Sequence, residues 1–77
     1  MSSELNKKIS AIFKDMSAIY QYMGGEERFR ALAYLKASRA IGTLQQDISD
    51  YIKSNTLEEI PGIGESIAEK IREYART

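Results

Sequence analysis

The stretch that decides the fold is residues 60–71, IPGIGESIAEKI, which holds the only proline and two of the five glycines of the chain. Gly62-Ile63-Gly64 can turn tightly, because glycine adopts positive φ without a steric penalty. An amphipathic segment follows directly, so the backbone N–H groups of this turn lie beside a helix N-terminus, where a phosphate oxygen can bind. Ile63 is expected to anchor the turn in the core. A plain helix–helix connector needs the same turn, so the glycines alone leave both interpretations open.

Length and composition predict a small globular domain. The 77 residues are 43% hydrophobic and 29% charged, and none is cysteine or histidine. Their absence excludes disulfides, zinc sites with cysteine or histidine ligands, and a Ser-His-Asp triad. No apolar run approaches the roughly 20 residues of a membrane span, and the polar start MSSELNKK is unlike a signal peptide. We expect an intracellular protein, cytoplasmic or nucleoid/nuclear, that requires no cofactor.

Helical periodicity runs through nearly the whole chain. Apolar residues recur every three or four positions, and Gly24-Gly25 separates the first two such segments. Thr56-Leu57-Glu58-Glu59 has the form of a capping box, which predicts a short helical turn before Pro61. No segment alternates as a strand does. The expected helical segments cover residues 4–23, 26–42, 43–54 and 65–76. The prediction is therefore one small all-α, four-helix domain over residues 1–77.

The charge of the chain is balanced overall and uneven along its length. The formal net charge is zero. Residues 26–41 carry four basic and two acidic side chains, whereas residues 42–77 carry seven acids and four bases. Any electrostatic footprint for nucleic acid is therefore expected on the middle of the chain. It should be weak, with a shallow dependence on salt.

Two strings in the sequence resemble a known family. LEEIPGIGESIAEKI resembles the helix-hairpin-helix motif, which grips DNA backbone through the amides of its hairpin. Upstream, FRALAYLKASRAI is similar to the second helix of the N-terminal lyase-type domain of family X DNA polymerases, the group of polymerase beta. The resemblance covers about residues 5–76, with the motif over 56–76. It implies a DNA-repair module that recognises the backbone of gapped or 5′-phosphorylated DNA, independently of sequence.

The resemblance also implies roles for individual residues. Lys70 matches a lysine that attacks the C1′ aldehyde of an abasic deoxyribose and forms a Schiff base before β-elimination. Glu69 matches an acid that assists proton transfer. The implied DNA contacts are those of Arg30, Tyr34, Gly62, Ile63, Gly64 and Ser66. The implied ligands of a monovalent cation, Na⁺ or K⁺, are the backbone carbonyls of Glu58, Ile60 and Ile63.

Departures from the family pattern bear mainly on catalysis. Ser66 and Glu58 stand where the family carries lysines, and Glu65 opens the last helix, where it repels a phosphate. Fewer positive charges weaken phosphate capture and also the field that would lower the pKa of Lys70. DNA binding therefore survives these departures better than lyase chemistry does.

Ordinary structural interpretations remain beside the functional ones. An exposed lysine on an amphipathic helix is usually a solvated charge, and this is the ordinary interpretation of Lys70. The basic residues of 26–41 are equally well explained as a solvated face, and Tyr34 as a core or boundary aromatic. The chain has no room for a nucleotidyltransferase domain, so we expect no polymerase activity. Whether the chain is a fragment of a longer protein is open. The alternative function is a non-catalytic helix-hairpin-helix domain that binds DNA structures or a protein partner.

Overall fold

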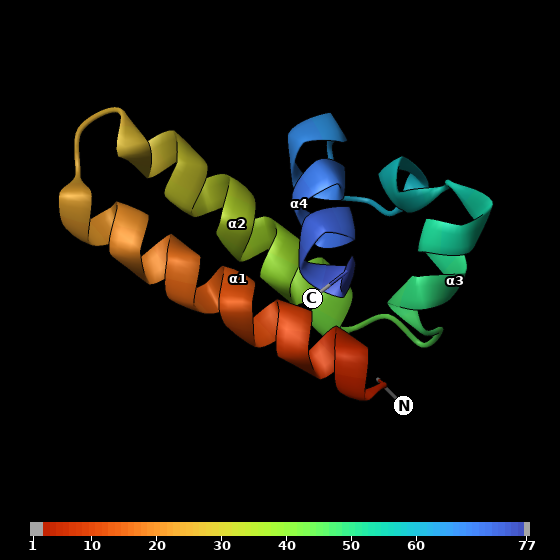
Figure 1. The fold of residues 1–77 in the computed structure, drawn as a ribbon. Coiled ribbons are helices and arrows are strands. Elements are labelled where there is room, and N and C mark those ends of the chain that lie inside the picture. Colours follow the sequence, from red (N-terminus) through yellow and green to blue (C-terminus); the bar gives the residue numbers. More distant parts are fainter. Residues whose placement is uncertain (1–2, 77) are drawn as a thin grey trace.

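The protein is a bundle of short helices with no strand in the part of the chain that the computed structural model describes, residues 3–76 (Figure 1). Its elements are α1 (Glu4–Met23), α2 (Glu27–Gly42), α3 (Ile48–Ser54), the 3₁₀ turn η1 (Leu57–Glu59) and α4 (Glu65–Arg76). The predicted all-α class is confirmed. Helix α3 begins at Ile48 rather than at residue 43, because Asp47 is its N-cap and accepts a 2.8 Å hydrogen bond from the Ser49 amide.

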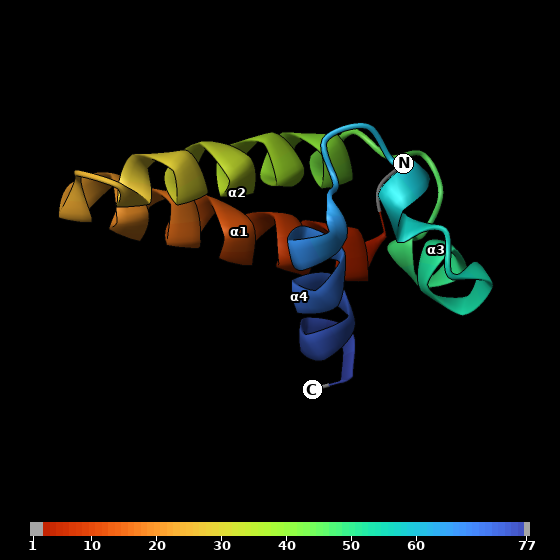
Figure 2. The ribbon, with the colours of Figure 1, turned by 90° about the horizontal axis from the view of Figure 1, so that it is seen from above.

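Helices α1 and α2 form an antiparallel hairpin that is longer than the rest of the molecule. Gly24 and Gly25 close it, with φ values of 69° and 60° that favour glycine. Figure 2 shows α4 crossing this hairpin near the end that lies away from the Gly24-Gly25 connection. Helix α3 and η1 lie at that same end. The other half of the hairpin therefore extends past α4 with no helix over it.

Short side chains close the interface between α1 and α2. Ser10 and Ser38 each donate a 2.8 Å hydrogen bond to the backbone carbonyl of the other. Farther along, Ser17 donates to the Ala31 carbonyl at 2.7 Å. A Cβ added at Gly42 would meet the Ser10 Oγ at 3.2 Å, so the helices are close there. The buried hydroxyls of Ser17 and Ser38 are thus hydrogen-bonded, as buried polar groups need to be.

The core lies where α3, η1 and α4 pack against the base of the hairpin. The largest fully buried apolar side chains come from every element: Ile9, Phe13, Ile41, Ile48, Leu57 and Ile71. Tyr74 of α4 adds a polar link to α1, because its hydroxyl donates to the Met16 sulfur at 3.1 Å. The core thus fixes α4 on the hairpin.

Asn6 ties α1 to the start of α3. This side chain is fully buried. Its amide nitrogen donates to the Gln46 carbonyl at 2.9 Å, and its oxygen accepts from the Ile48 amide at 2.7 Å. Asn6 therefore holds the connection between α2 and α3 against the base of the hairpin.

The predicted capping box does not form. Residues 57–59 do make the expected short helical turn, but the Thr56 side chain caps no amide of η1. Its hydroxyl lies 2.6 Å from the Ser54 Oγ instead. The Glu59 amide, from which the Thr56 hydroxyl of a capping box would accept, donates instead to the Thr56 backbone carbonyl at 3.0 Å.

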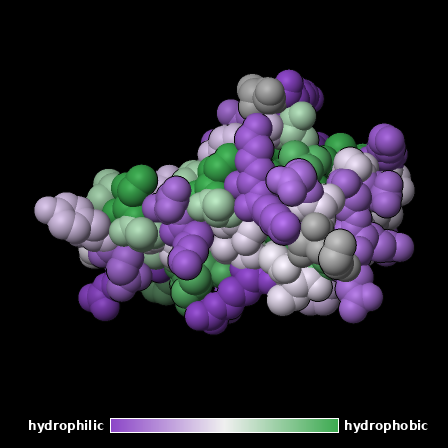
Figure 3. All heavy atoms as spheres, turned by 90° about the horizontal axis from the view of Figure 1, so that it is seen from below, coloured by the Kyte–Doolittle hydropathy of each residue, from purple (hydrophilic) through white to green (hydrophobic). Residues whose placement is uncertain are grey.

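Apolar periodicity continues beyond the residues that are buried. Five large apolar side chains on the uncovered half of the hairpin are exposed: Ile19, Tyr22, Met23, Phe29 and Leu32. Figure 3 shows green, hydrophobic side chains near the narrow end of the molecule, behind a pale outermost side chain. The spacing marks one apolar face over 4–23, but α4 covers only part of that face. None of the described helices is both long and apolar enough to span a bilayer.

Candidate nucleic-acid interface

The corner between η1 and α4 is a tight turn held by isoleucines. Gly62 has φ 94°, in the region that favours glycine. Ile60 and Ile63 on either side are both buried, 4% exposed. The Ile63 amide donates to the Ile60 carbonyl at 3.0 Å, which closes the turn. The expected anchoring role of Ile63 is confirmed.

Three backbone amides at this corner donate no hydrogen bond within the part of the chain that the structure describes. The first hydrogen bond of α4 runs from the Ala68 amide to the Gly64 carbonyl at 2.9 Å. The amides before it have no acceptor within the helix, as at any helix N-terminus. Among the hydrogen bonds of residues 3–76, none is donated by the amides of Gly64, Glu65 or Ser66. All three residues are exposed, and their amides are left with no acceptor among the described residues.

A groove runs between α2 and α4 and leads to this corner. Its deeper part, about 480 Å³, lies over Tyr34 between Arg30 and Lys70. Its second part, about 420 Å³, reaches Gly62 and Gly64. Both parts share Phe29, Ala33, Ser66 and Ile67, so they form one continuous feature, the α2–α4 groove. Tyr20, Leu32, Lys36 and Glu65 complete its lining.

Arg30 extends along the edge of the groove on α2. Its Nε lies 3.7 Å from the Glu27 carboxylate, one turn earlier in the helix. Its guanidinium carbon lies 5.9 Å from the centre of the Tyr20 ring, within the range of a cation–π contact. Two-thirds of the side chain remains exposed. Arg30 is therefore positioned by its neighbours while its charge stays accessible.

Tyr34 belongs to both the core and the groove. Its ring packs edge-on against Phe13 at 5.3 Å and stacks on Tyr20 at 5.5 Å between centroids. Burial, then the neighbouring Tyr20, raises the pKa of the Tyr34 hydroxyl, and the charges of Lys70 and Arg30 oppose that rise. The two interpretations of Tyr34 as a packing residue and as a groove residue are therefore compatible.

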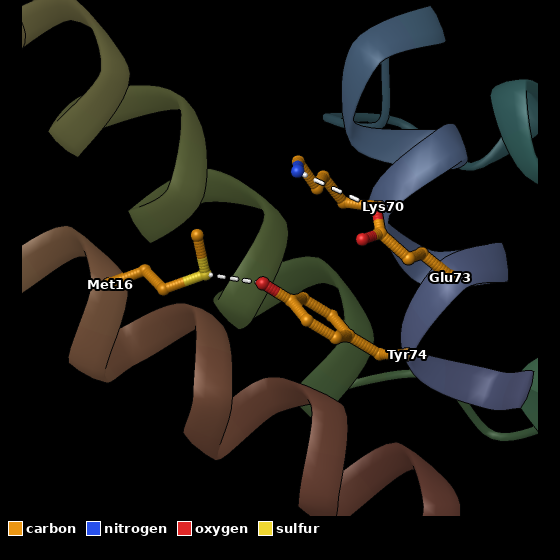
Figure 4. A network of polar contacts seen from close by, with 4 residues as sticks. All are labelled: Met16, Lys70, Glu73 and Tyr74. Atoms are coloured by element: carbon orange, nitrogen blue, oxygen red, sulfur yellow. Dashed lines mark hydrogen bonds and ion pairs between the residues drawn. The ribbon is translucent and has the colours of Figure 1, made fainter. Parts of the chain in front are cut away.

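Lys70 reaches from α4 toward α2, as Figure 4 shows. Its Nζ lies 3.5 Å from the Glu73 carboxylate, one turn later in the same helix. The charge and hydrogen bond of Glu73 raise the pKa of Lys70 above its usual range, and Tyr34 adds to the effect. The amine is thus a cation at neutral pH, which suits a phosphate contact.

Two charged residues that the sequence analysis considered, Glu69 and Arg39, lie away from the groove. Glu69 is exposed on another side of α4, beside Arg72 and Arg76. Arg39 lies near Ser10 and Lys14, on the side of α2 away from α4. The basic stretch 26–41 is therefore divided, and only Arg30 and Lys36 of its four basic residues line the groove.

The carbonyls considered for a cation belong to the turn itself. The Ile60 carbonyl accepts the Ile63 amide, and a carbonyl oxygen has a second lone pair. Carbonyl oxygens are hard ligands of the kind that alkali cations accept, so Glu58, Ile60 and Ile63 fit such an ion chemically. Within residues 3–76 no cluster of three acidic side chains offers an alternative metal site. The cation stays a prediction.

Sequence reasoning missed Phe29 as a groove residue. Phe29 is 80% exposed and lines both parts of the groove. A signal was available in the helix register, because Phe29, Leu32 and Lys36 follow one another at steps of three and four. An apolar residue on the same face as a lysine is expected to meet solvent.

Comparison with known families identifies the chain. A family model described as "Helix-hairpin-helix domain" matches residues 4–77. The chain therefore belongs to the helix-hairpin-helix domain family, and nucleic-acid binding is the general activity which that membership suggests. No curated protein and no solved structure matches the chain.

Proposed function

We propose that the α2–α4 groove binds the sugar-phosphate backbone of DNA, with a preference for gapped or 5′-phosphorylated ends and without reading base sequence. The observation that carries this proposal is the meeting of open amides and cations in one groove. The amides of Gly64, Glu65 and Ser66 lie at the end of the groove that is formed by the corner between η1 and α4. The cationic side chains of Arg30 and Lys70 lie at its other end.

Phosphate capture at the corner relies on the backbone. A phosphate oxygen accepts hydrogen bonds from amides at a helix N-terminus, where the helix dipole also favours an anion. Such contacts fix the position of a strand and carry no sequence information. Glu65 opposes an anion there, and Lys36 on the facing helix compensates part of that repulsion.

Phe29 supports a preference for gapped DNA. An exposed aromatic ring stacks on an unpaired base of any identity, whereas a paired base inside a duplex offers no free face. Phe29 lines both the part of the groove at the η1–α4 corner and the part beside Arg30. A strand whose phosphates contact both ends would therefore carry a base past this ring.

Binding is expected to be weak and modestly sensitive to salt. Three cationic side chains, Arg30, Lys36 and Lys70, line the groove. Release of the counterions of three phosphates gives a slope of about −3 in a plot of log K against log salt concentration. The balanced net charge of the whole chain adds no long-range attraction.

A lyase activity through Lys70 is a finer version of the same proposal. The likeness to family X polymerases supports it, as does the direction in which Lys70 reaches. Its raised pKa works against it, because the amine must lose its proton to attack an aldehyde. Borohydride trapping on abasic DNA tests this version, since a covalent adduct that disappears in Lys70→Ala supports it. Absence of an adduct removes the lyase and leaves the binding proposal.

Fluorescence anisotropy tests the binding proposal. We expect gapped DNA with a 5′-phosphate to bind more tightly than a blunt duplex at low salt. Arg30→Ala should weaken binding about tenfold, the value of one charged hydrogen bond. Arg39→Ala is the matched control, since it removes the same charge from the same helix away from the groove. Equal losses in both variants would mean that the groove is not the binding surface.

A protein-binding function is the second candidate, because of the exposed hairpin tip. Tyr22 is 94% exposed, and Ile19 and Met23 beside it are also exposed. If neither DNA binds more tightly than about millimolar at low salt, the DNA proposal fails. The apolar tip then becomes the surface to test.

A further inference from the structure

We propose that Glu27 and Glu73 act as internal competitors for the two cations of the deep part of the groove, so that a DNA phosphate binds there by displacing a carboxylate of the protein itself. This inference rests on the proposed function and concerns its regulation. It makes Glu27 and Glu73 residues that set the affinity of the groove, although neither lines it.

The geometry of the two pairs carries the inference. Arg30 and Lys70 face the same pocket from two different helices. Each is paired within its own helix, one turn away, to Glu27 at 3.7 Å and to Glu73 at 3.5 Å. These are the only ion pairs among the described residues. Both ion pairs therefore involve the cations that would contact DNA in the groove.

Both cations can exchange partners. The side chain of Arg30 is 66% exposed and that of Lys70 is 44% exposed. Neither pair is closer than 3.5 Å, whereas strong charge-assisted hydrogen bonds are about 2.7–2.9 Å long. An incoming phosphate oxygen makes the shorter contact and can therefore replace the carboxylate.

Glu27 is more buried than Glu73. Its side chain is 31% exposed against 64% for Glu73, and its Oε2 is buried without a hydrogen bond. A carboxylate oxygen out of water interacts more strongly with the nearby charge of Arg30. Lys36, in the part of the groove at the η1–α4 corner, has no carboxylate partner within residues 3–76. The cations in the deep part of the groove are thus paired with carboxylates, whereas the cation at the η1–α4 corner is not, so an anion meets less competition at the corner.

Neutral variants with matched controls test this inference. Glu73→Gln and Glu27→Gln free Lys70 and Arg30 with little change in shape. Glu69→Gln and Glu26→Gln make the same change of net charge beside them, on exposed residues that pair with neither cation. We expect each test variant to bind gapped, 5′-phosphorylated DNA about two- to fivefold more tightly than its control at low salt, the range of an exposed ion pair. Circular dichroism melts show whether each variant is folded.

A second readout needs no DNA. The pKa of the Lys70 amine, followed by NMR of its side chain, should fall in Glu73→Gln and stay unchanged in Glu69→Gln. Equal DNA affinities in Glu73→Gln and Glu69→Gln, with wild-type binding intact, would overturn the competition and leave the proposed function standing. An unchanged Lys70 pKa in Glu73→Gln would overturn it as well. Failure of every variant and of the wild type to bind DNA would remove the proposed function, and the competition with it.

Discussion

The two faces of helix α2 carry polar side chains in different settings: hydrogen-bonded and buried toward α1, and charged and exposed toward α4. On the face toward α1, Ser38 is buried and bonds reciprocally with Ser10 at 2.8 Å. On the face toward α4, Arg30 is largely exposed and pairs with Glu27 at 3.7 Å. On the first face, the hydroxyl of Ser38 has its partner inside the protein. The second has charges whose partners are distant and replaceable.

The difference teaches where structure and function reside in this small domain. Short, buried hydrogen bonds specify one packing, because breaking them leaves a polar group without water. Long, exposed ion pairs contribute little stability and can exchange for a ligand. The face toward α1 therefore sets the fold, and the α2–α4 groove is available to bind.

The largest effect is expected from a core aromatic on the packed side. Phe13 is fully buried against Tyr34 and Tyr74. Phe13→Ala should lower the free energy of unfolding by about 3–5 kcal/mol, because it leaves a cavity. Urea denaturation measures this loss. A loss below about 1 kcal/mol would mean that the hairpin and α4 do not pack as described.

Phe29→Ala tests the face of α2 that lines the α2–α4 groove. We expect it to weaken binding of gapped DNA by about 1–3 kcal/mol, the contribution of one stacked base. Stability should change by less than about 0.5 kcal/mol, because the ring is exposed. Tyr22→Ala is the control, an exposed aromatic that does not line the groove. A large loss of stability in Phe29→Ala would contradict the division between the two faces.

Ser38→Ala sharpens the comparison on the packed side. It removes the donor to the Ser10 carbonyl and leaves Ser38's own carbonyl bonded to Ser10. The expected cost is about 1 kcal/mol of unfolding free energy, with DNA binding unchanged. Reduced DNA affinity at full stability would show that the two faces are coupled.

The smallest effect lies outside α2, at the cap of α3. Hydrogen bonding by Ser49 lowers the pKa of Asp47 below its usual range. A lowered pKa adds stability that is present above the unfolded value of about 3.9 and is lost as pH falls through the folded value. Asp47→Asn should therefore lose less stability than wild type between pH 5 and pH 3 in urea titrations. Equal losses would place the acid sensitivity elsewhere.

Local patterns predicted most of the fold. Glycine pairs and helical periodicity located α1, α2 and α4 to within a residue or so, because those signals act within a few residues. Burial was harder to predict. Periodicity assigns Ile19 and Met23 to the apolar face of α1, but only the crossing position of α4 decides that they are exposed.

The sequence predicted which residues line the candidate site, but it did not predict which acidic residue pairs with Lys70. The resemblance singled out Arg30, Tyr34 and Lys70, which line one pocket. The same reasoning selected Glu69, which lies on another side of α4. Glu73 instead meets Lys70. Several residues of one helix lie within reach of a lysine, and rotamers decide which of them pairs with it.

The most direct measurement is an NMR titration of the labelled protein with gapped, 5′-phosphorylated DNA at low salt. We predict the largest amide shifts at Gly62, Gly64, Glu65 and Ser66 and along the groove side of α2. Amides at the α1–α3 junction, such as those of Asn6 and Ile48, should stay unmoved. Shifts confined to other surfaces, or none at millimolar DNA, would contradict the claim that the α2–α4 groove binds the DNA backbone.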